Sequence, residues 1–253
     1  MINKRGQMAV WVIVALVIVV TIVLVFILRG KVAPVVGVQG TEDPKGYIDN
    51  CVRKNVNDAV DLLLPQGGFI NTQHTKTYKN INIEYLCYNQ GNYYPCINEH
   101  PMFLNEVKKE ITDYTKDKIE GCFEDYKAEM GKRGADIVLE PMNMNIELAP
   151  ERIYAAIDRK VTITQKEESY SIDEFNIEII NPVYDLGRIA MEIASQEAKY
   201  CYFEYVGYMI LYPKFKISVF PMSDNTKIYT IEDKRSGKKM NIAIRSCAIP
   251  PGF

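Results

Sequence analysis

The chain has 253 residues, six cysteines and a formal net charge of −2. Its Lys and Arg residues are interspersed with Asp and Glu, so the sequence predicts no positive electrostatic potential that would attract nucleic acid. We therefore expect no nucleic-acid partner. About 220 residues follow an apolar segment near the N-terminus, which is enough for one sizeable core or two small lobes.

The apolar segment runs from Met8 to Leu28 and contains a single polar residue, Thr21. As a helix, its roughly 21 residues would rise about 31 Å, which matches the hydrocarbon thickness of a bilayer. The segment is too long for a secretory signal, and the residues after it offer a poor cleavage site. We therefore expect a retained transmembrane or stalk helix at residues 7–29, because a buried core helix of this length rarely lacks a polar stripe.

The cysteines decide the orientation of this segment, because basic residues flank both of its ends and the positive-inside rule is nearly balanced. All six cysteines follow the segment, and none belongs to a CxxC motif. An even set beyond a membrane segment is typical of a disulfide framework in an oxidising compartment, the alternative being reduced thiols in a cytosolic domain. We expect the N-terminus inside the cell and everything after about Lys31 outside.

The local pattern favours one disulfide pairing among the many that six cysteines allow. Cys87 and Cys96 flank a turn-like stretch between two strand-like runs. Cys51 and Cys122 each share a face with apolar residues of a predicted helix, so packing of the two helices would bring them together. The third pair is then Cys201–Cys247.

The rest of the chain predicts a linker and an α+β domain. Residues 1–6 are expected to form a cytoplasmic leader, and residues 30–46, which carry Gly and Pro, a linker. The extracytoplasmic domain follows at 47–253, and a division into two lobes would fall near residue 134. Apolar spacing predicts three helices, over about Tyr47–Leu64, from His100-Pro101 to Gly131–Gly134, and from Asn181-Pro182 to about Tyr205.

Alternation of apolar and polar residues predicts mostly antiparallel strands. The expected strands are Ile81–Cys87, Met144–Leu148, Ile153–Ile163, Tyr170–Ile179, Phe215–Phe220, Lys227–Ile231 and Met240–Ile244. Arg159 is the one break in its strand, and the change of phase between Ile172 and Phe175 predicts a bulge. The fold class is therefore α+β, with an N-terminal transmembrane or stalk helix before a disulfide-stapled domain.

No catalytic, cofactor-binding or metal-binding motif is found, and we expect none of these functions. The sequence lacks HExxH, GxSxG, GxxxxGK[ST] and GxGxxG motifs. His74 and His100 lie in different predicted loops, and His100 is better explained as a residue that begins a helix. The stretch RSGKK, residues 235–239, favours a hairpin turn over a phosphate loop. Four acidic residues at helical spacing favour a solvated helix face over a cation site: Asp113, Asp117, Glu120 and Glu124.

The stretch YCYFEYVGYMILYP, residues 200–213, is unusually aromatic. As a surface patch it would bind a glycan or a partner protein, because tyrosine offers a large contact area with a polar tip. The alternative, which we favour, is that these rings fill the core where the third helix meets the sheet. Gly67 and Gly68 likewise predict a helix end and a tight turn rather than a ligand site.

The N-terminal stretch KRGQMAVW resembles the class III signal of archaeal type IV pilin-like proteins, with a basic pair, a Gly, a polar residue and an unbroken apolar helix. The resemblance implies that a prepilin-type peptidase reads Lys4, Arg5 and Gly6 and cleaves before Gln7. The helix would then pack into a filament core or remain in the membrane. The chain departs from bacterial pilins at Trp11, where the fifth mature residue is often Glu. The remainder resembles uncharacterised membrane-anchored proteins of small-genome archaea, a likeness that carries no known activity.

Two functions of different class are consistent with the sequence. In the first, the chain is a structural subunit of a pilus-like filament, and its partners are copies of itself and the processing peptidase. In the second, it is a monomeric single-pass membrane protein that displays an extracytoplasmic binding or adhesion domain to another surface protein. The expected location is the cell membrane with the C-terminal domain outside, or an extracellular filament.

Overall fold

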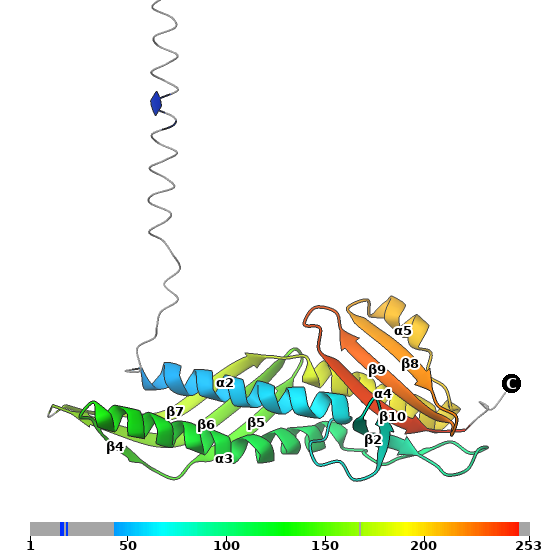
Figure 1. Ribbon diagram of the computed structural model, residues 1–253, viewed down its shortest axis with the longest axis horizontal. Coiled ribbons are helices and arrows are strands. Elements are labelled where there is room, and N and C mark those ends of the chain that lie inside the picture. Colours follow the sequence, from blue (N-terminus) through cyan, green and yellow to red (C-terminus); the bar gives the residue numbers. More distant parts are fainter. Residues whose placement is uncertain (1–15, 18, 20–42, 167, 248–253) are drawn as a thin grey trace, which may run out of the picture. The chain divides into compact units, whose positions relative to one another are not determined.

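The computed structural model of the chain describes residues 16, 17, 19, 43–166 and 168–247 (Figure 1). The chain divides into two compact units, Met1–Asp43 and Pro44–Phe253, and each is considered by itself. The second unit begins three residues before the domain start expected from the sequence.

In the first unit, Leu16, Val17, Val19 and Asp43 are described; the first three are helical, and all four are exposed. The remainder of the predicted stalk helix, the four processing residues from Lys4 to Gln7 and residues 30–42 of the predicted linker lie outside the described residues. Residues 44–46 of that linker belong to α2 instead. Within the described part of the chain, no helix has both the length and the apolar character needed to cross a bilayer.

The second unit is an α+β domain with four α-helices and two sheets in its described part, which confirms the predicted fold class at that level. Its elements in chain order are α2 (Pro44–Leu63), the short 3-10 helix η1 (Leu64–Gln66), β1 (Thr75–Tyr78), β2 (Ile81–Tyr88), β3 (Ile97–Asn98), α3 (Phe103–Lys132), β4 (Asp136–Leu139), β5 (Asn143–Ala149), β6 (Arg152–Gln165), β7 (Glu168–Ile180), α4 (Val183–Tyr200), α5 (Tyr205–Leu211), β8 (Phe215–Pro221), β9 (Thr226–Asp233) and β10 (Lys239–Arg245).

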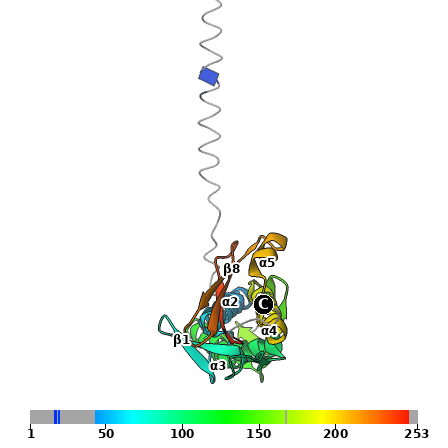
Figure 2. The same ribbon diagram turned by 90° about the vertical axis from the view of Figure 1, so that its right-hand side faces the viewer.

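Helices α2 and α3 lie side by side over one sheet (Figures 1 and 2). Helix α2 begins at Pro44 rather than near Tyr47, because proline fits the first helical turn, where its missing N–H has no partner to lose. The buried face of α2 carries the predicted apolar residues from Ile48 to Leu63, and that of α3 carries those from Phe103 to Phe123. Both helices end close to the predicted glycines.

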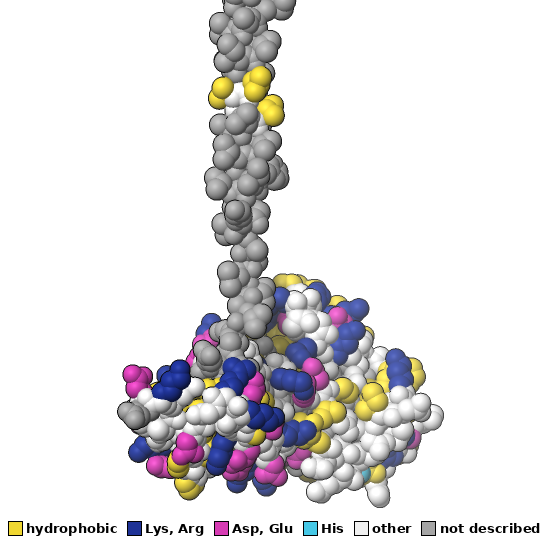
Figure 3. Space-filling view, turned by 60° about the vertical axis from the view of Figure 1, so that its left-hand side comes forward, with side chains coloured by type: hydrophobic (Ala, Val, Ile, Leu, Met, Phe, Trp, Pro, Cys, Tyr) yellow, Lys and Arg dark blue, Asp and Glu magenta, His cyan; other side chains and the backbone are white. Residues whose placement is uncertain are grey.

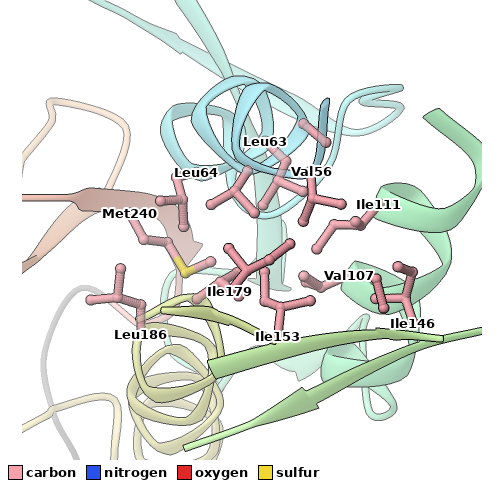
Figure 4. Close-up of a cluster of buried hydrophobic side chains, with 14 of the residues drawn as sticks. Val56, Leu63, Leu64, Val107, Ile111, Ile146, Ile153, Ile179, Leu186 and Met240 are labelled. Carbon is pink, nitrogen blue, oxygen red and sulfur yellow. The ribbon is translucent and has the colours of Figure 1, made fainter. Parts of the chain in front are cut away.

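The sheet under these helices has four strands. Strands β4 and β5 pair with successive parts of one edge of β6, and β7 pairs with its other edge. The inward residues of β6 are buried at every second position from Ile153 to Ile163, as the alternation predicts. Figure 4 shows that the core above this sheet joins Val56 of α2, Val107 of α3 and Ile153 of β6. It also includes Leu186 of α4 and Met240 of β10, so elements before and after residue 134 share one core.

The bulge in this sheet lies where the sequence predicts it, but its additional residue is on the other strand. The ladder passes from the pair Asp158–Glu174 to the pair Val161–Ile172, which is three steps along β6 and two along β7. The phase change in β7 therefore reflects an extra residue in the strand opposite.

The second sheet has six strands, in the order β1-β2-β10-β9-β8 with β3 on β2. Its pairs are antiparallel except β2 with β10. Strand β2 was expected to be half-buried, but residues 83–87 are all buried because a second, smaller cluster of apolar side chains covers its other face. The rings of Tyr78 and Phe220, on the two outermost strands, lie 5.1 Å apart, so the sheet curls. Helix α5 contacts the edge strand β8, where the sulfur of Met209 accepts the N–H of Ile217 at 3.1 Å.

The turn after η1 requires its glycines. Gly67 and Gly68 have φ values of +87° and +94°, which L side chains rarely adopt. A Cβ added at Gly68 would also lie 2.6 Å from the ring of Phe103. These two residues end the helix and form a tight turn, as predicted.

Three disulfides cross-link the domain: Cys51–Cys122, Cys87–Cys96 and Cys201–Cys247. They are the three pairs that the sequence favours, and they close loops of 71, 9 and 46 residues. In the loop-closure model each removes roughly 2.5–4.5 kcal/mol of unfolded-state entropy.

We expect all six cysteines to be oxidised in protein taken from its native compartment. Alkylation before reduction, followed by peptide mass mapping, should label none of them. Because the three pairs include every cysteine of the chain, labelling of two or more before reduction would contradict an oxidising location.

Candidate functional site

The C-terminal turn of α4 contains a fully buried carboxylate. Glu197 is 0% exposed, and both of its carboxylate oxygens lie 2.8 Å from the Nζ of Lys227 on β9. The hydroxyl of Tyr229, also on β9, donates to the same carboxylate. Burial, together with the adjacent carboxylate, raises the pKa of Tyr229, so this phenol remains a neutral donor. The cluster fixes the end of α4 to the second sheet.

The chain turns sharply after this cluster. Cys201 ends α4 in the left-handed conformation, with φ +55°, and its disulfide holds the turn to Cys247 after β10. Its carbonyl accepts a further hydrogen bond of 2.8 Å from Lys227 Nζ. The predicted third helix therefore ends at Tyr200, about one turn earlier than expected, and the aromatic stretch continues as a separate helix, α5.

Helix α5 begins with a side-chain cap. The carboxylate of Glu204 accepts the backbone N–H of Gly207 at 3.2 Å, and the hydroxyl of Tyr202 donates to it at 2.6 Å. The hydrogen bond from Tyr202 lowers the pKa of Glu204, and the same bond raises the pKa of the Tyr202 phenol. This pair orients the first turn of α5.

Our expectation that the rings of the aromatic stretch fill the core is met only in part, because Tyr205 and Tyr208 pack against the core whereas Tyr200, Tyr202 and Tyr212 are exposed. Phe203 and Cys201 are buried, but no residue of α5 is. Five large side chains on and beside this helix are exposed to between 43% and 75%, and we call them the α5 surface: Tyr202, Val206, Ile210, Leu211 and Tyr212. After the turn at Cys201, α5 packs only one side against the core, through Tyr205, Tyr208 and Met209, and leaves its other side exposed.

A groove of about 470 Å³ lies beside the α5 surface, between α4 and α5. Glu192 and Gln196 line it from α4, and Phe203, Tyr208 and Ile210 are among the residues that line it from the α5 side. The ring centroids of Phe203 and Tyr208 are 5.5 Å apart. The groove is mainly apolar with a few polar groups, which is the usual character of a ligand-binding pocket.

The two histidines lie in different loops, as predicted, but the fold brings both toward one buried carboxylate. Glu84 of β2 is 4% exposed and accepts backbone N–H groups at 2.7 and 2.8 Å from the loop before β1. His74 Nδ1 lies 2.9 Å from Glu99, whereas His100 lies 2.6 Å from Glu106 and 4.0 Å from Glu84. His100 lies just before α3, but the helix begins at Phe103 rather than at Pro101, which is in a turn. These contacts hold loops together, which is a structural role.

The acidic row on α3 is exposed, as predicted, but two of its members serve a buried cation. Arg159 points inward from β6 with 4% of its side chain exposed, and its Nη2 lies 3.6 Å from Glu120 and 3.8 Å from Glu124. Its guanidinium also lies over the ring of Phe123, at 4.9 Å. Among the described residues, no group of three or more His, Cys, Asp or Glu is positioned to hold a metal ion.

The remaining sequence motifs give no site. The stretch 235–239 forms the hairpin turn between β9 and β10 that we predicted, in which Asp233 accepts both the N–H and the hydroxyl of Ser236. On the face that Figure 3 shows, basic and acidic side chains are interspersed rather than gathered by sign. Comparison with protein-family models, curated proteins and solved structures found no match to this chain. The α5 surface and its groove are thus the candidate functional site.

Proposed function

We propose that the chain is a surface-displayed structural subunit of a pilus-like filament, assembled through its N-terminal apolar helix. The observation that carries this proposal is the order of features along the chain: a basic pair and a glycine, then the uninterrupted apolar segment Met8–Leu28, then a separate compact unit. A discarded signal would not need such a length, whereas a helix that packs against copies of itself would.

The architecture of the second unit supports display outside the cell. Three disulfides tie its helices and sheets together, which favours an oxidising location. Its candidate site is an apolar surface and groove, which act by contact rather than by proton or group transfer. A subunit of this kind requires a prepilin-type peptidase to cleave after Gly6, so that Gln7 becomes the N-terminus.

A second function, a monomeric single-pass protein with an extracytoplasmic binding or adhesion domain, is favoured by the α5 surface. An exposed apolar patch of this kind marks an interaction site in many proteins. In this alternative the apolar segment is only an anchor, and the domain binds its partner without assembly.

The two functions differ in where the mature chain is found. With its processing enzyme and assembly machinery produced in the same cells, we expect the chain in sheared filaments, with Gln7 as its first residue. The matched control is Gly6→Val, which leaves the apolar helix unchanged but removes the small residue before the cleavage site. A chain found only in detergent-extracted membranes, or one that begins at Met1, would overturn the filament proposal and leave the anchored binding domain.

A further inference from the structure

The α5 surface is an apolar ridge that nothing in the described chain covers. Ile210 and Leu211 are each 75% exposed, and Val206 and Tyr212 are about half exposed at 50% and 49%. Both views place α5 at the margin of the domain (Figures 1 and 2). Ile210 and Leu211 also line the groove beside α5. Their exposure shows that this side of the groove is open, which suits a broad apolar surface better than an enclosed small ligand.

The composition of the ridge matches the boundary between lipid and water. Tyrosines, whose rings are apolar and whose hydroxyls are polar, concentrate at membrane interfaces. Tyr202 and Tyr212 flank the aliphatic residues, and Lys199 extends its ammonium over the ring of Tyr200, at 4.8 Å, where its stem would cover apolar surface. Glu192 and Glu204 line the groove beside this surface, and acidic groups favour neutral headgroups over anionic ones.

The length of chain between the apolar segment and the domain limits how far the start of the domain can lie from a bilayer. If Met8–Leu28 is in the membrane, residues 30–43 are the connection to α2, which begins at Pro44. Fourteen or so residues reach at most roughly 50 Å when extended, and about 20 Å on average as a coil. The effective concentration of lipid surface at α5 is therefore high, and a weak contact is sufficient.

We infer that α5 docks in the headgroup region of the same membrane that holds the N-terminal helix, lying in the plane of the interface. This inference rests on the membrane anchor of the second function above and goes beyond it, because it gives the exterior domain a second contact with lipid. A helix of seven residues rises only about 10 Å and cannot span a bilayer, but its apolar side can enter the interface. Docking would place the mouth of the α4–α5 groove against the headgroups.

The single tryptophan of the chain provides a test. In a Trp11→Phe background, Ile210→Trp places a reporter on the α5 surface, and Ile180→Trp places one at a site of equal exposure (80% against 75%) on the end of β7. Full-length variants are reconstituted at low density in phosphatidylcholine vesicles with brominated or ordinary acyl chains. We expect brominated lipid to reduce the Ile210→Trp emission about twofold or more, as for an interfacial helix, with little change for Ile180→Trp.

Unmodified protein reports the anchor separately, because Trp11 lies within the apolar segment. If brominated lipid quenches Trp11 but quenches Ile210→Trp no more than Ile180→Trp, the inference is overturned and the anchoring remains intact. An unquenched Trp11 would overturn the anchoring and the inference together. Quenching of Ile210→Trp that disappears as protein density rises would show that a second copy covers α5 in preference to lipid, which also overturns it. Leu211→Trp, 75% exposed, repeats the measurement at a neighbouring position.

Discussion

Lys227→Met is expected to lower the free energy of unfolding of the domain by about 3–5 kcal/mol, because it leaves a buried carboxylate without its cation. Glu197 is 0% exposed, and Lys227 Nζ contacts both of its oxygens at 2.8 Å. Methionine fills the volume of the lysine stem, so the loss measures the charge rather than a cavity. Urea unfolding of the disulfide-intact domain, followed by circular dichroism, gives the value.

Removing the whole polar cluster should cost far less than the sum of the single changes. Lys227→Met combined with Glu197→Leu and Tyr229→Phe removes all three charged or phenolic groups together and takes a donor only from the carbonyl of Cys201. Buried ion pairs replaced in this way are often neutral in stability. The coupling between the changes should exceed about 2 kcal/mol. The control is Lys54→Met, which breaks the exposed pair with Asp58 on α2 and should leave the unfolding midpoint unchanged. Independent, additive losses would show that the cluster does not act as a unit.

Local periodicity was sufficient to predict most elements of the fold. The apolar faces of α2 and α3 repeat at helical spacing, and each face carries one cysteine, so packing them together specified Cys51–Cys122. Alternation in β6 and β7 specified a long hairpin with an irregularity. These features depend on residues close in sequence and on the burial of the apolar faces of helices and strands against one another.

The candidate site could not be predicted in the same way, because it depends on one backbone conformation. No residue type around Cys201 indicates that its backbone has φ +55°. The turn at Cys201 nevertheless decides whether the rings that follow it point into the core or away from it. Glu197 could have been found, since it extends the apolar stripe of α4 beyond Ile193 and Ala194. Arg159 could also have been found, as the one charge on the inward side of β6. A charge at a core-facing position indicates a partner of opposite charge from another element, although it does not say which.

The second large effect expected concerns the apolar helix. Under the filament proposal, Val17→Lys should abolish filaments while most of the chain still reaches the membrane. Copies packed through this helix meet by contact between apolar ridges, with Thr21 as the single polar residue of the segment. A lysine near its middle costs on the order of 2.5–3.5 kcal/mol on the insertion scale. One such charge leaves about 20 apolar residues, enough for insertion, but the cost recurs in every subunit of a filament.

Two quantities are measured for Val17→Lys and for the matched control Val17→Leu: the number of surface filaments and the abundance of the chain in the membrane fraction. We expect filaments from the leucine variant and none from the lysine variant, with similar membrane abundance. Loss of both filaments and membrane abundance in Val17→Lys would mean that the charge blocks insertion, and Leu24→Lys, nearer the end of the segment, then separates insertion from assembly. If the unmodified chain, produced with its peptidase and assembly machinery, forms no filaments, the filament proposal is wrong. The apolar helix is then an anchor, and the exterior domain acts alone.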